Sequence, residues 1–80
     1  MKKTITMPAL KPGMKEGILC RWNAAAGEKV SKGDILFEVE TDKVVTEVEA
    51  EEDCTVSVIL TEEGDAAAPG EPLCEVEVSE

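Results

Sequence analysis

The chain has 80 residues, enough for one small domain, and eight basic against eighteen acidic side chains give it a net charge of −10. Such acidity makes nucleic acid and anionic membranes poor partners, because both attract surfaces rich in Lys and Arg. Histidine and tyrosine are absent. The commonest general base and metal ligand is therefore missing, and we expect neither a catalytic site nor a metal site.

The charge and the cysteines narrow the remaining possibilities. The acidity predicts solubility and, as a sharper interpretation, a docking preference for basic surfaces on partner proteins. Cys20, Cys54 and Cys74 are an odd set without a Cys-x-x-Cys pair, which argues against a disulfide framework and a zinc site. We interpret each as a small buried hydrophobic residue in a reducing compartment. The apolar runs are short, so we expect neither a signal peptide nor a membrane span.

Short β-strand patterns occur, in chain order, at residues 4–7, 17–22, 35–40, 44–49, 56–60 and 73–78. Most of them alternate between apolar and polar residues, whereas 56–60 is nearly continuously apolar and predicts a buried strand. The alanine runs at 24–26 and 66–68 are too short for helices. Several short strands at close spacing predict an all-β sandwich or barrel. Its expected core includes Trp22, Phe37, Val39, Val48 and Leu60.

An internal repeat relates the two halves of the chain. A shift of 37 residues aligns glycines and strand residues, placing Gly27 on Gly64, Gly33 on Gly70 and residues 33–40 on residues 70–77. Glycines in register with an alternating apolar face are hard to attribute to chance. We predict two half-domains, at about residues 3–40 and 44–78. Each would supply about four strands, and the two would pack face to face about an approximate two-fold axis.

The connection between the two halves is a very short turn. Only Thr41, Asp42 and Lys43 separate two good strand patterns. In a two-fold arrangement this connection lies at one end of the molecule, with both chain termini towards the other. Because the turn lacks glycine, we predict a type I turn with Asp42 inside it. Lys43 would then stand alone at an exposed tip.

An exposed lysine at such a tip can serve as an attachment point. Its primary amine can form an amide with a carboxylic acid cofactor, which makes a long flexible arm on a firm base. The domain does little to activate the amine, so a separate ligase must supply an activated acyl donor. We interpret the other lysines as ordinary solvated charges: Lys2, Lys3, Lys11, Lys15, Lys29 and Lys32.

Residues 38–50, Glu-Val-Glu-Thr-Asp-Lys-Val-Val-Thr-Glu-Val-Glu-Ala, resemble the lipoyl-attachment hairpin of lipoyl domains. These domains belong to the acyltransferase components of 2-oxo acid dehydrogenase complexes. Residues 7–17 resemble the first strand and loop of such domains, most closely those of pyruvate dehydrogenase acetyltransferases, and the likeness covers nearly the whole chain. One departure is Cys54, where the family usually has a glycine. If that position needs a positive φ, Cys54 would be strained.

The resemblance implies a flattened β-barrel of two four-stranded antiparallel sheets, one lipoyl domain over residues 1–80, cut from a larger multidomain subunit. Lys43 would carry lipoate as a swinging arm that passes acyl groups and electrons between active sites. The expected overall conversion is pyruvate to acetyl-CoA. The domain itself would be non-catalytic, within a dihydrolipoyllysine-residue acyltransferase. The attachment site would comprise Lys43 and its flanks Glu40, Thr41, Asp42 and Val44. The loop that helps the dehydrogenase recognise its carrier would comprise Leu10, Lys11, Pro12, Gly13 and Met14.

The implied partners follow from the same resemblance. They are a lipoate ligase or lipoyl/octanoyl transferase, a decarboxylating thiamine-diphosphate dehydrogenase, an acyltransferase core with coenzyme A, and dihydrolipoamide dehydrogenase. The isolated domain is expected to be monomeric. Its expected location is the cytoplasm of a bacterium or the mitochondrial matrix of a eukaryote.

Three other interpretations remain open. A biotinyl carrier domain of a biotin-dependent carboxylase shares the fold, but its lysine typically lies between methionines, whereas Asp42 and Val44 flank Lys43 here. Lipoyl-like hairpins of membrane efflux adaptors lack the lysine and have long flanking helices. An unmodified acidic protein-interaction module is the third interpretation, and nothing specific in the sequence supports it.

Overall fold

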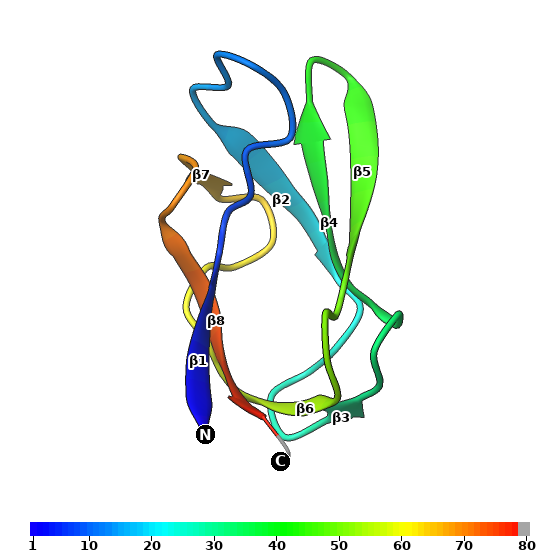
Figure 1. Ribbon diagram of the computed structural model, residues 1–80. Helices are drawn as coiled ribbons and strands as arrows, with labels where there is room; N and C mark the ends of the chain where they lie inside the picture. The colour runs from blue at the N-terminus through cyan, green and yellow to red at the C-terminus, as the bar shows by residue number, and fades with distance from the viewer. Residues whose placement is uncertain (79–80) are drawn as a thin grey trace.

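The computed structural model describes residues 1–78, which form eight strands and no helix. The strands are β1 (Lys2–Thr6), β2 (Gly17–Trp22), β3 (Lys29–Val30), β4 (Ile35–Thr41), β5 (Val44–Glu49), β6 (Cys54–Ile59), β7 (Ala66–Ala67) and β8 (Pro72–Val78). They form two four-stranded antiparallel sheets, ordered β1-β8-β6-β3 and β5-β4-β2-β7 (Figure 1). The predicted all-β, two-sheet fold is confirmed. Nothing in residues 1–78 forms a helix able to cross a bilayer.

The two halves of the repeat are interlocked rather than stacked. Each sheet takes two strands from each half, and the ladders β1–β8, β3–β6, β4–β5 and β2–β7 all join strands of different halves. The prediction of two half-domains packed face to face is therefore wrong in this respect. Alternate strands of each half enter opposite sheets, so that each of the two facing sheets contains strands of both halves.

The repeat itself is visible in the backbone hydrogen bonds. The amide of Gly27 donates to the carbonyl of Val56 at 2.7 Å, and the amide of Gly64 donates to the carbonyl of Leu19 at 2.7 Å. Both glycines have a positive φ, 90° and 94°, in the left-handed region that favours glycine. The glycine register therefore reflects a real equivalence of the two halves, because the same turn makes the same contact in each.

The core lies between the sheets and is built mainly from aliphatic side chains. Phe37 is fully buried, and its ring packs against that of Trp22 with centroids 5.2 Å apart. Trp22 is half-buried, and its indole N–H donates a hydrogen bond to the carbonyl of Thr61 at 2.8 Å. Val39 is fully buried and Val48 partly buried against the core.

The strand predicted to be buried at residues 56–60 is only partly so. A bulge between Val56 and Val58 turns Val58 outward, and its side chain is 45% exposed. Ile59 then packs on the core. Leu60 follows at the opposite face and is 46% exposed, so its prediction as a core residue is wrong. Continuous apolar sequence cannot reveal a bulge, which changes the face that each later residue occupies.

Two of the three cysteines are buried, as predicted for all of them. Cys54 and Cys74 are buried, whereas Cys20 is partly exposed. Burial raises the pKa of the Cys74 thiol to about 11, and the neighbouring Cys54 adds to this shift. Burial also raises the pKa of Cys54. Both thiols therefore stay protonated at neutral pH and act as small apolar side chains.

The expected strain at Cys54 is absent, because Cys54 is not among the residues with positive φ. Its equivalent in the first half, Gly17, also lacks a positive φ, but an added Cβ there would lie 2.6 Å from Cγ1 of Val39 and 2.9 Å from Cε of Met14. Glycine is required at that position by crowding and not by backbone conformation. The second half has room for the Cys54 side chain.

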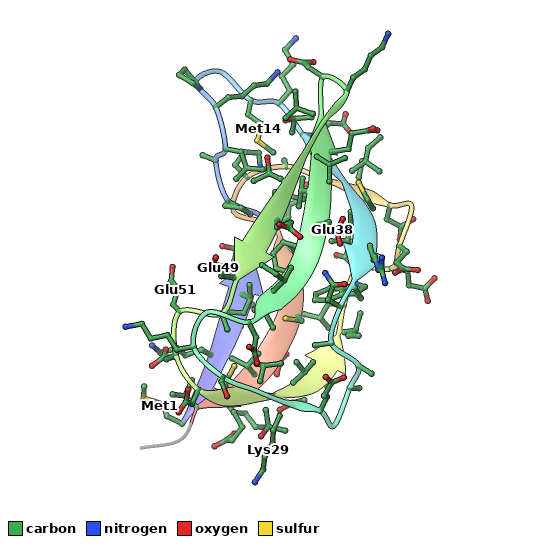
Figure 2. The ribbon with its side chains drawn as sticks, turned by 90° about the vertical axis from the view of Figure 1, so that its right-hand side faces the viewer. Met1, Met14, Lys29, Glu38, Glu49 and Glu51 are labelled. Carbon is green, nitrogen blue, oxygen red and sulfur yellow. The ribbon has the colours of Figure 1, made fainter. Side chains whose placement is uncertain are left out.

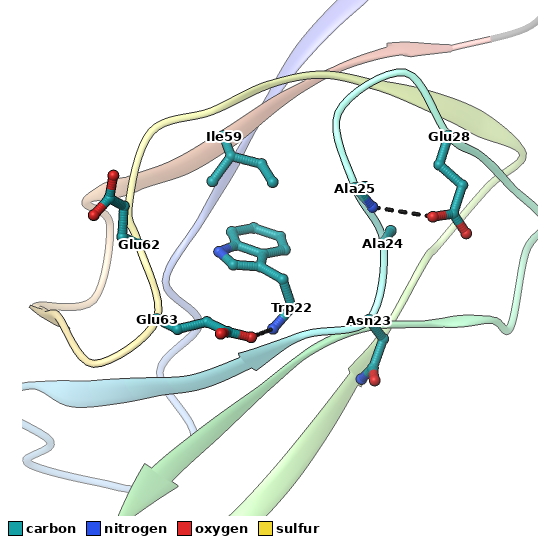
Figure 3. Close-up of a pocket in the computed structure, with 8 residues that line it drawn as sticks. All are labelled: Trp22, Asn23, Ala24, Ala25, Glu28, Ile59, Glu62 and Glu63. Atoms are coloured by element: carbon teal, nitrogen blue, oxygen red, sulfur yellow. Dashed lines mark hydrogen bonds between the residues drawn. The ribbon is translucent and has the colours of Figure 1, made fainter.

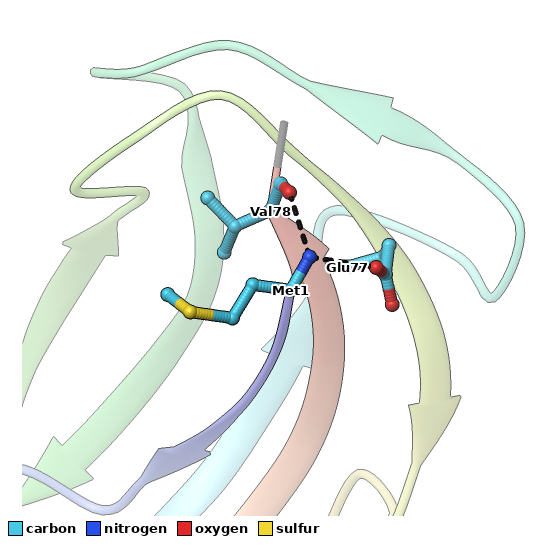
Figure 4. Close-up of polar contacts among 3 residues, drawn as sticks. All are labelled: Met1, Glu77 and Val78. Atoms are coloured by element: carbon cyan, nitrogen blue, oxygen red, sulfur yellow. Dashed lines mark hydrogen bonds and ion pairs between the residues drawn. The ribbon is translucent and has the colours of Figure 1, made fainter. Parts of the chain in front are cut away.

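An ion pair joins Met1 to the last strand at the end of the β1–β8 ladder. The ammonium of Met1 donates to Oε1 of Glu77 at 2.8 Å and to the carbonyl of Val78 at 3.2 Å (Figure 4). The hydrogen bond from the ammonium to Glu77, together with the charges of the ammonium and of Lys2, holds the pKa of Glu77 below its ordinary value. Because the pKa is lower in the folded state, the interaction stabilises the fold at pH values above the ordinary pKa of the carboxyl group. The contribution is lost as the pH falls through the lowered pKa.

We therefore expect Glu77→Gln to lower the unfolding temperature slightly near neutral pH, because the pair is exposed and such pairs contribute little. The difference from the parent chain should shrink as the pH falls from about 6 to about 2. Thermal unfolding followed by circular dichroism at several pH values measures this. Glu62→Gln is the control, since the Glu62 side chain is exposed and forms no hydrogen bond or ion pair within residues 1–78. A difference that grows at low pH would contradict the assignment.

Candidate lysine attachment site

The β4–β5 hairpin forms one end of the molecule. Its turn consists of Asp42 and Lys43, because β4 ends at Thr41 and β5 begins at Val44. Both turn residues have positive φ, 47° and 66°, which is the signature of a type I′ turn. The prediction of a type I turn is therefore wrong. A two-residue link between twisted antiparallel strands favours the primed turn, and here this preference outweighs the cost of placing non-glycine residues in it.

Lys43 is placed at the tip of a rigid support. The ladder below it pairs Thr41 with Val44 and Val39 with Thr46, and Val39 is fully buried. Lys43 is exposed and has no hydrogen bond or ion pair with any residue in the described range 1–78. The start of β1 and the end of β8 lie at the opposite end of the molecule, as predicted (Figure 1). The site therefore fits a group attached through the lysine amine, because the amine is free and the backbone beneath it is fixed.

The loop between β1 and β2 lies against this hairpin. Lys11 forms an ion pair with Asp42, and Lys11, Lys15, Glu16, Thr41 and Asp42 line a shallow hollow of 390 Å³ with Gly13. The structure thus brings the predicted recognition loop next to the predicted attachment residue. Lys15 and Glu16 were not singled out in the sequence. Their only signal was a pair of opposite charges directly before a strand.

The residues of the predicted loop do not share one environment. Lys11 faces the hairpin, whereas Pro12 and Gly13 are exposed at the outer bend. Leu10 and Met14 are partly buried and pack against the core. The Leu10 amide lies 3.4 Å from the Met14 sulfur, which closes the loop on itself. Leu10 and Met14 therefore anchor the loop, and its outer bend is free to meet a partner.

The hairpin flanks also differ from one another. Glu40 and Thr41 are half-buried at the end of β4, whereas Val44 is 60% exposed. An apolar side chain this exposed beside an exposed lysine is available for contact with another molecule. The structure thus brings Lys43 together with Asp42, Val44 and Lys11. It places Glu40 further down the strand.

The left-handed turn carries a measurable cost. For a residue with a side chain this conformation costs roughly 1–2 kcal/mol, and glycine avoids most of it. We expect Lys43→Gly to raise the free energy of unfolding by about 0.5–1 kcal/mol, since glycine also loses more entropy on folding. Lys43→Ala should leave it nearly unchanged. Chemical denaturation of the three chains measures the difference, and a less stable Lys43→Gly variant would contradict the turn assignment.

A second hollow lies away from the hairpin. It has a volume of 570 Å³ and is lined by Trp22, Asn23, Ala24, Ala25, Glu28, Ile59, Glu62 and Glu63 (Figure 3). Glu63 accepts a hydrogen bond from the Trp22 amide and Glu28 accepts one from the Ala25 amide. Two of its carboxylates thus hold loop backbone in place. Its lining contains no amine or thiol, so it offers no attachment chemistry.

The fold and the lysine tip together define a small β carrier, and the comparisons agree. The chain belongs to the biotin/lipoyl family, whose description is "Biotin-requiring enzyme" and which matches residues 3–76. A solved lipoyl domain of the 2-oxoglutarate dehydrogenase complex from Azotobacter vinelandii superposes with a TM-score of 0.77 and 34% identity, over 96% of this chain and 95% of that one. A likeness of this extent supports the lipoyl type over the biotinyl type.

Curated relatives also support the lipoyl type. The chain is 48% identical over 64 residues to the dihydrolipoyllysine-residue acetyltransferase component of the pyruvate dehydrogenase complex of Rhizobium meliloti, covering 80% of this chain and 14% of that protein. It is 40% identical over 76 residues to the corresponding Rickettsia bellii protein, covering 95% and 18%. The chain thus spans less than a fifth of these relatives. A multi-domain long-chain acyl-CoA carboxylase, with a TM-score of 0.83 and 17% identity over 98% of this chain and 7% of that one, shares the fold.

Proposed function

We propose that lipoate is attached to Lys43 through an amide and that the chain acts as a lipoyl carrier in a 2-oxo acid dehydrogenase complex. The observation that supports this most directly is the exposed Lys43 at the tip of a type I′ turn, without a partner among residues 1–78. When bound, the cofactor supplies a disulfide that accepts acyl groups and electrons. The chain holds the cofactor at the tip of the β4–β5 hairpin.

The residues around Lys43 would each act on its position or its recognition. The turn fixes the direction in which the lysine stem leaves the backbone. Asp42 and Val44 flank the lysine at the same exposed tip, where a modifying enzyme would meet them first. The ion pair between Lys11 and Asp42 would hold the loop beside the hairpin. Glu40 and Thr41, which are half-buried, would keep the turn in its register with β5.

The partners are proposed from the kind of complex to which the relatives belong. They are a thiamine-diphosphate dehydrogenase that decarboxylates the 2-oxo acid, an acyltransferase with coenzyme A, dihydrolipoamide dehydrogenase, and the enzyme that attaches lipoate. Pyruvate is the proposed 2-oxo acid, since the relatives named above belong to pyruvate dehydrogenase complexes. The outer bend of the loop, at Pro12 and Gly13, would meet the dehydrogenase. Residues 1–80 would form one domain of a larger acyltransferase subunit, in a bacterial cytoplasm or a mitochondrial matrix.

Tethering explains why such a carrier is useful. A group bound to Lys43 through a flexible arm reaches successive active sites at an effective concentration on the millimolar scale. It also remains bound between steps. The domain adds its own length to that reach, since it extends 35 Å along its longest axis and has the turn between β4 and β5, which contains the lysine, at one end.

The test is the intact mass of the chain after expression in cells that are supplied with lipoate and contain both lipoate ligase and biotin ligase. We expect a gain that matches one lipoyl amide, mapped to Lys43 by peptide analysis and absent from Lys43→Gln. A biotinyl amide at Lys43 would instead place the chain among the carboxylase carriers. A folded chain without modification in the presence of active ligases would refute the carrier proposal and leave an acidic interaction module.

A further inference from the structure

We propose that the free edge of β5 is a docking strand for an extended, basic segment of a partner protein, which would add to the sheet beside the hairpin. β5 is the last strand of its sheet and pairs only with β4. The other edge of β5 therefore presents main-chain groups that the sheet does not use. This inference goes beyond the carrier proposal, because no part of it depends on modification of Lys43.

The hairpin register identifies which backbone groups are free. A two-residue turn is closed by a hydrogen-bonded pair, which here is Thr41 with Val44. Alternate residues of an antiparallel strand direct their N–H and C=O groups to opposite sides. Val44, Thr46 and Val48 therefore bond to β4. Val45, Glu47 and Glu49 direct theirs away from the sheet, in the pattern that an added antiparallel strand needs.

The β5 edge lacks most of the usual protection of edge strands. Exposed edges are commonly blocked by charged side chains, above all lysine, by proline or by very short length, and β5 has only its glutamates. β1, at the edge of the other sheet, begins with Lys2 and Lys3, and the edge strands β3 and β7 are only two residues long. β5 has six residues, VVTEVE, without lysine, proline or glycine. Among residues 1–78 it is the long sheet edge that remains open to an incoming strand.

The charges on this edge select the incoming strand. Glu47 and Glu49 are exposed, and Glu47 is directly opposite Glu38 in the ladder, a like-charge pair that costs stability. A Lys or Arg placed beside Glu47 would offset this repulsion. A second copy of the chain would instead bring further glutamates to the same place, on molecules that each have a net charge of −10. The edge therefore favours a basic partner over self-association.

A crevice beside β5 would receive apolar side chains of the same segment. It has a volume of 270 Å³, and its apolar walls come from Ile5, Leu36 and Val48, with Glu49 and Glu51 at its rim. Figure 2 shows Glu49 and Glu51 on this side of the molecule, along the path from β5 into the following turn. Residues of an added strand alternate in direction. A segment that alternates basic and aliphatic residues would place its basic side chains beside Glu47 and its aliphatic side chains in the crevice.

The experiment uses the unmodified chain labelled with ¹⁵N and the synthetic peptide acetyl-Lys-Val-Lys-Val-Lys-amide. We expect saturable NMR shifts that are largest at the amides of Val45, Glu47 and Glu49, with slower hydrogen exchange at those amides. The control is the same peptide N-methylated at every residue. It keeps the charges and the side chains, but none of its residues has a backbone N–H to donate to the β5 edge. Equal binding of both peptides would overturn the proposal, because charge alone would then explain the binding.

Two protein variants separate edge pairing from general attraction. Glu47→Lys should weaken binding several-fold, and the remaining affinity should fall less steeply with added salt. Glu62→Lys makes the same charge change at an exposed position in the hollow of Figure 3 and should change the affinity little. A larger loss with Glu62→Lys would overturn the proposal. So would concentration-dependent shifts at the β5 amides without peptide, which would identify a second copy as the occupant.

Discussion

Exchanging Asp42 and Lys43, so that the lysine precedes the aspartate in the same turn, should slow attachment of lipoate about a hundredfold or more, because displacement of a reacting group by about 1 Å can cost this much. The exchange keeps composition and net charge. It moves the amine by one residue and removes the ion pair between Lys11 and Asp42. The rate is measured by the mass of the chain over time with purified lipoate ligase and an activated lipoyl donor.

Two further variants show which change matters. Asp42→Asn keeps the lysine in place and removes only the charge, so it should retain most of the rate if position dominates. Lys43→Gln should give no modification and shows the background from other lysines. An exchanged chain that is modified as fast as the parent would mean that the ligase accepts any lysine at this tip. The turn geometry would then have no part in selection.

Gly17→Ala should lower the free energy of unfolding by about 1–3 kcal/mol, the usual cost of forcing an extra carbon into a packed core. The new Cβ would lie 2.6 Å from Cγ1 of Val39, which is fully buried, and 2.9 Å from Cε of Met14. In a domain of this size the unfolding temperature falls by roughly 4–8 °C for each kcal/mol. Thermal unfolding by circular dichroism and urea denaturation measure the loss.

Cys54 provides the matched position for this experiment, because it is the equivalent of Gly17 in the second half. Cys54→Ala keeps a side chain that already fits and should cost less than Gly17→Ala. Met14→Ala should cost less in the Gly17→Ala chain than in the parent chain, since it also removes one of the two close contacts. A Gly17→Ala chain as stable as the parent would show that Val39 and Met14 can move aside at little cost.

The parts of the fold that follow from local pattern could be predicted from the sequence. The strands alternate, and the glycines that recur after 37 residues adopt nearly the same positive φ. The bulge after Val56 and the exposure of Leu60 could not be predicted, because they depend on pairing with β8. The interlocking of the halves was also missed. A repeat shows that two segments are alike, but it does not show to which sheet each strand belongs.

The candidate site, too, could be predicted from the sequence only in part. The place of Lys43 at the end opposite the termini followed from the repeat. The turn type did not, because the turn has no glycine and Lys43 has no preference for positive φ. Both residues adopt it because a two-residue link between twisted antiparallel strands favours the primed turn. The contact between Lys11 and Asp42 joins residues far apart in the chain, and only the folded structure brings them together. The free edge of β5 likewise emerges from sheet order and not from the sequence of that strand.

The interlocked halves have a consequence for how the chain is made. Four ladders join strands of different halves, so an unfinished chain that ends shortly after β5 has no partner for β1 and none for β3. At that stage β5, β4 and β2 can pair, but the opposing sheet that covers their apolar face is missing, and a small sheet without such packing is marginally stable in water. The lysine would then be available in its folded turn only after β8 has been synthesised and has closed its sheet. The lysine would therefore become ready for modification only once the last strand of its own domain has left the ribosome.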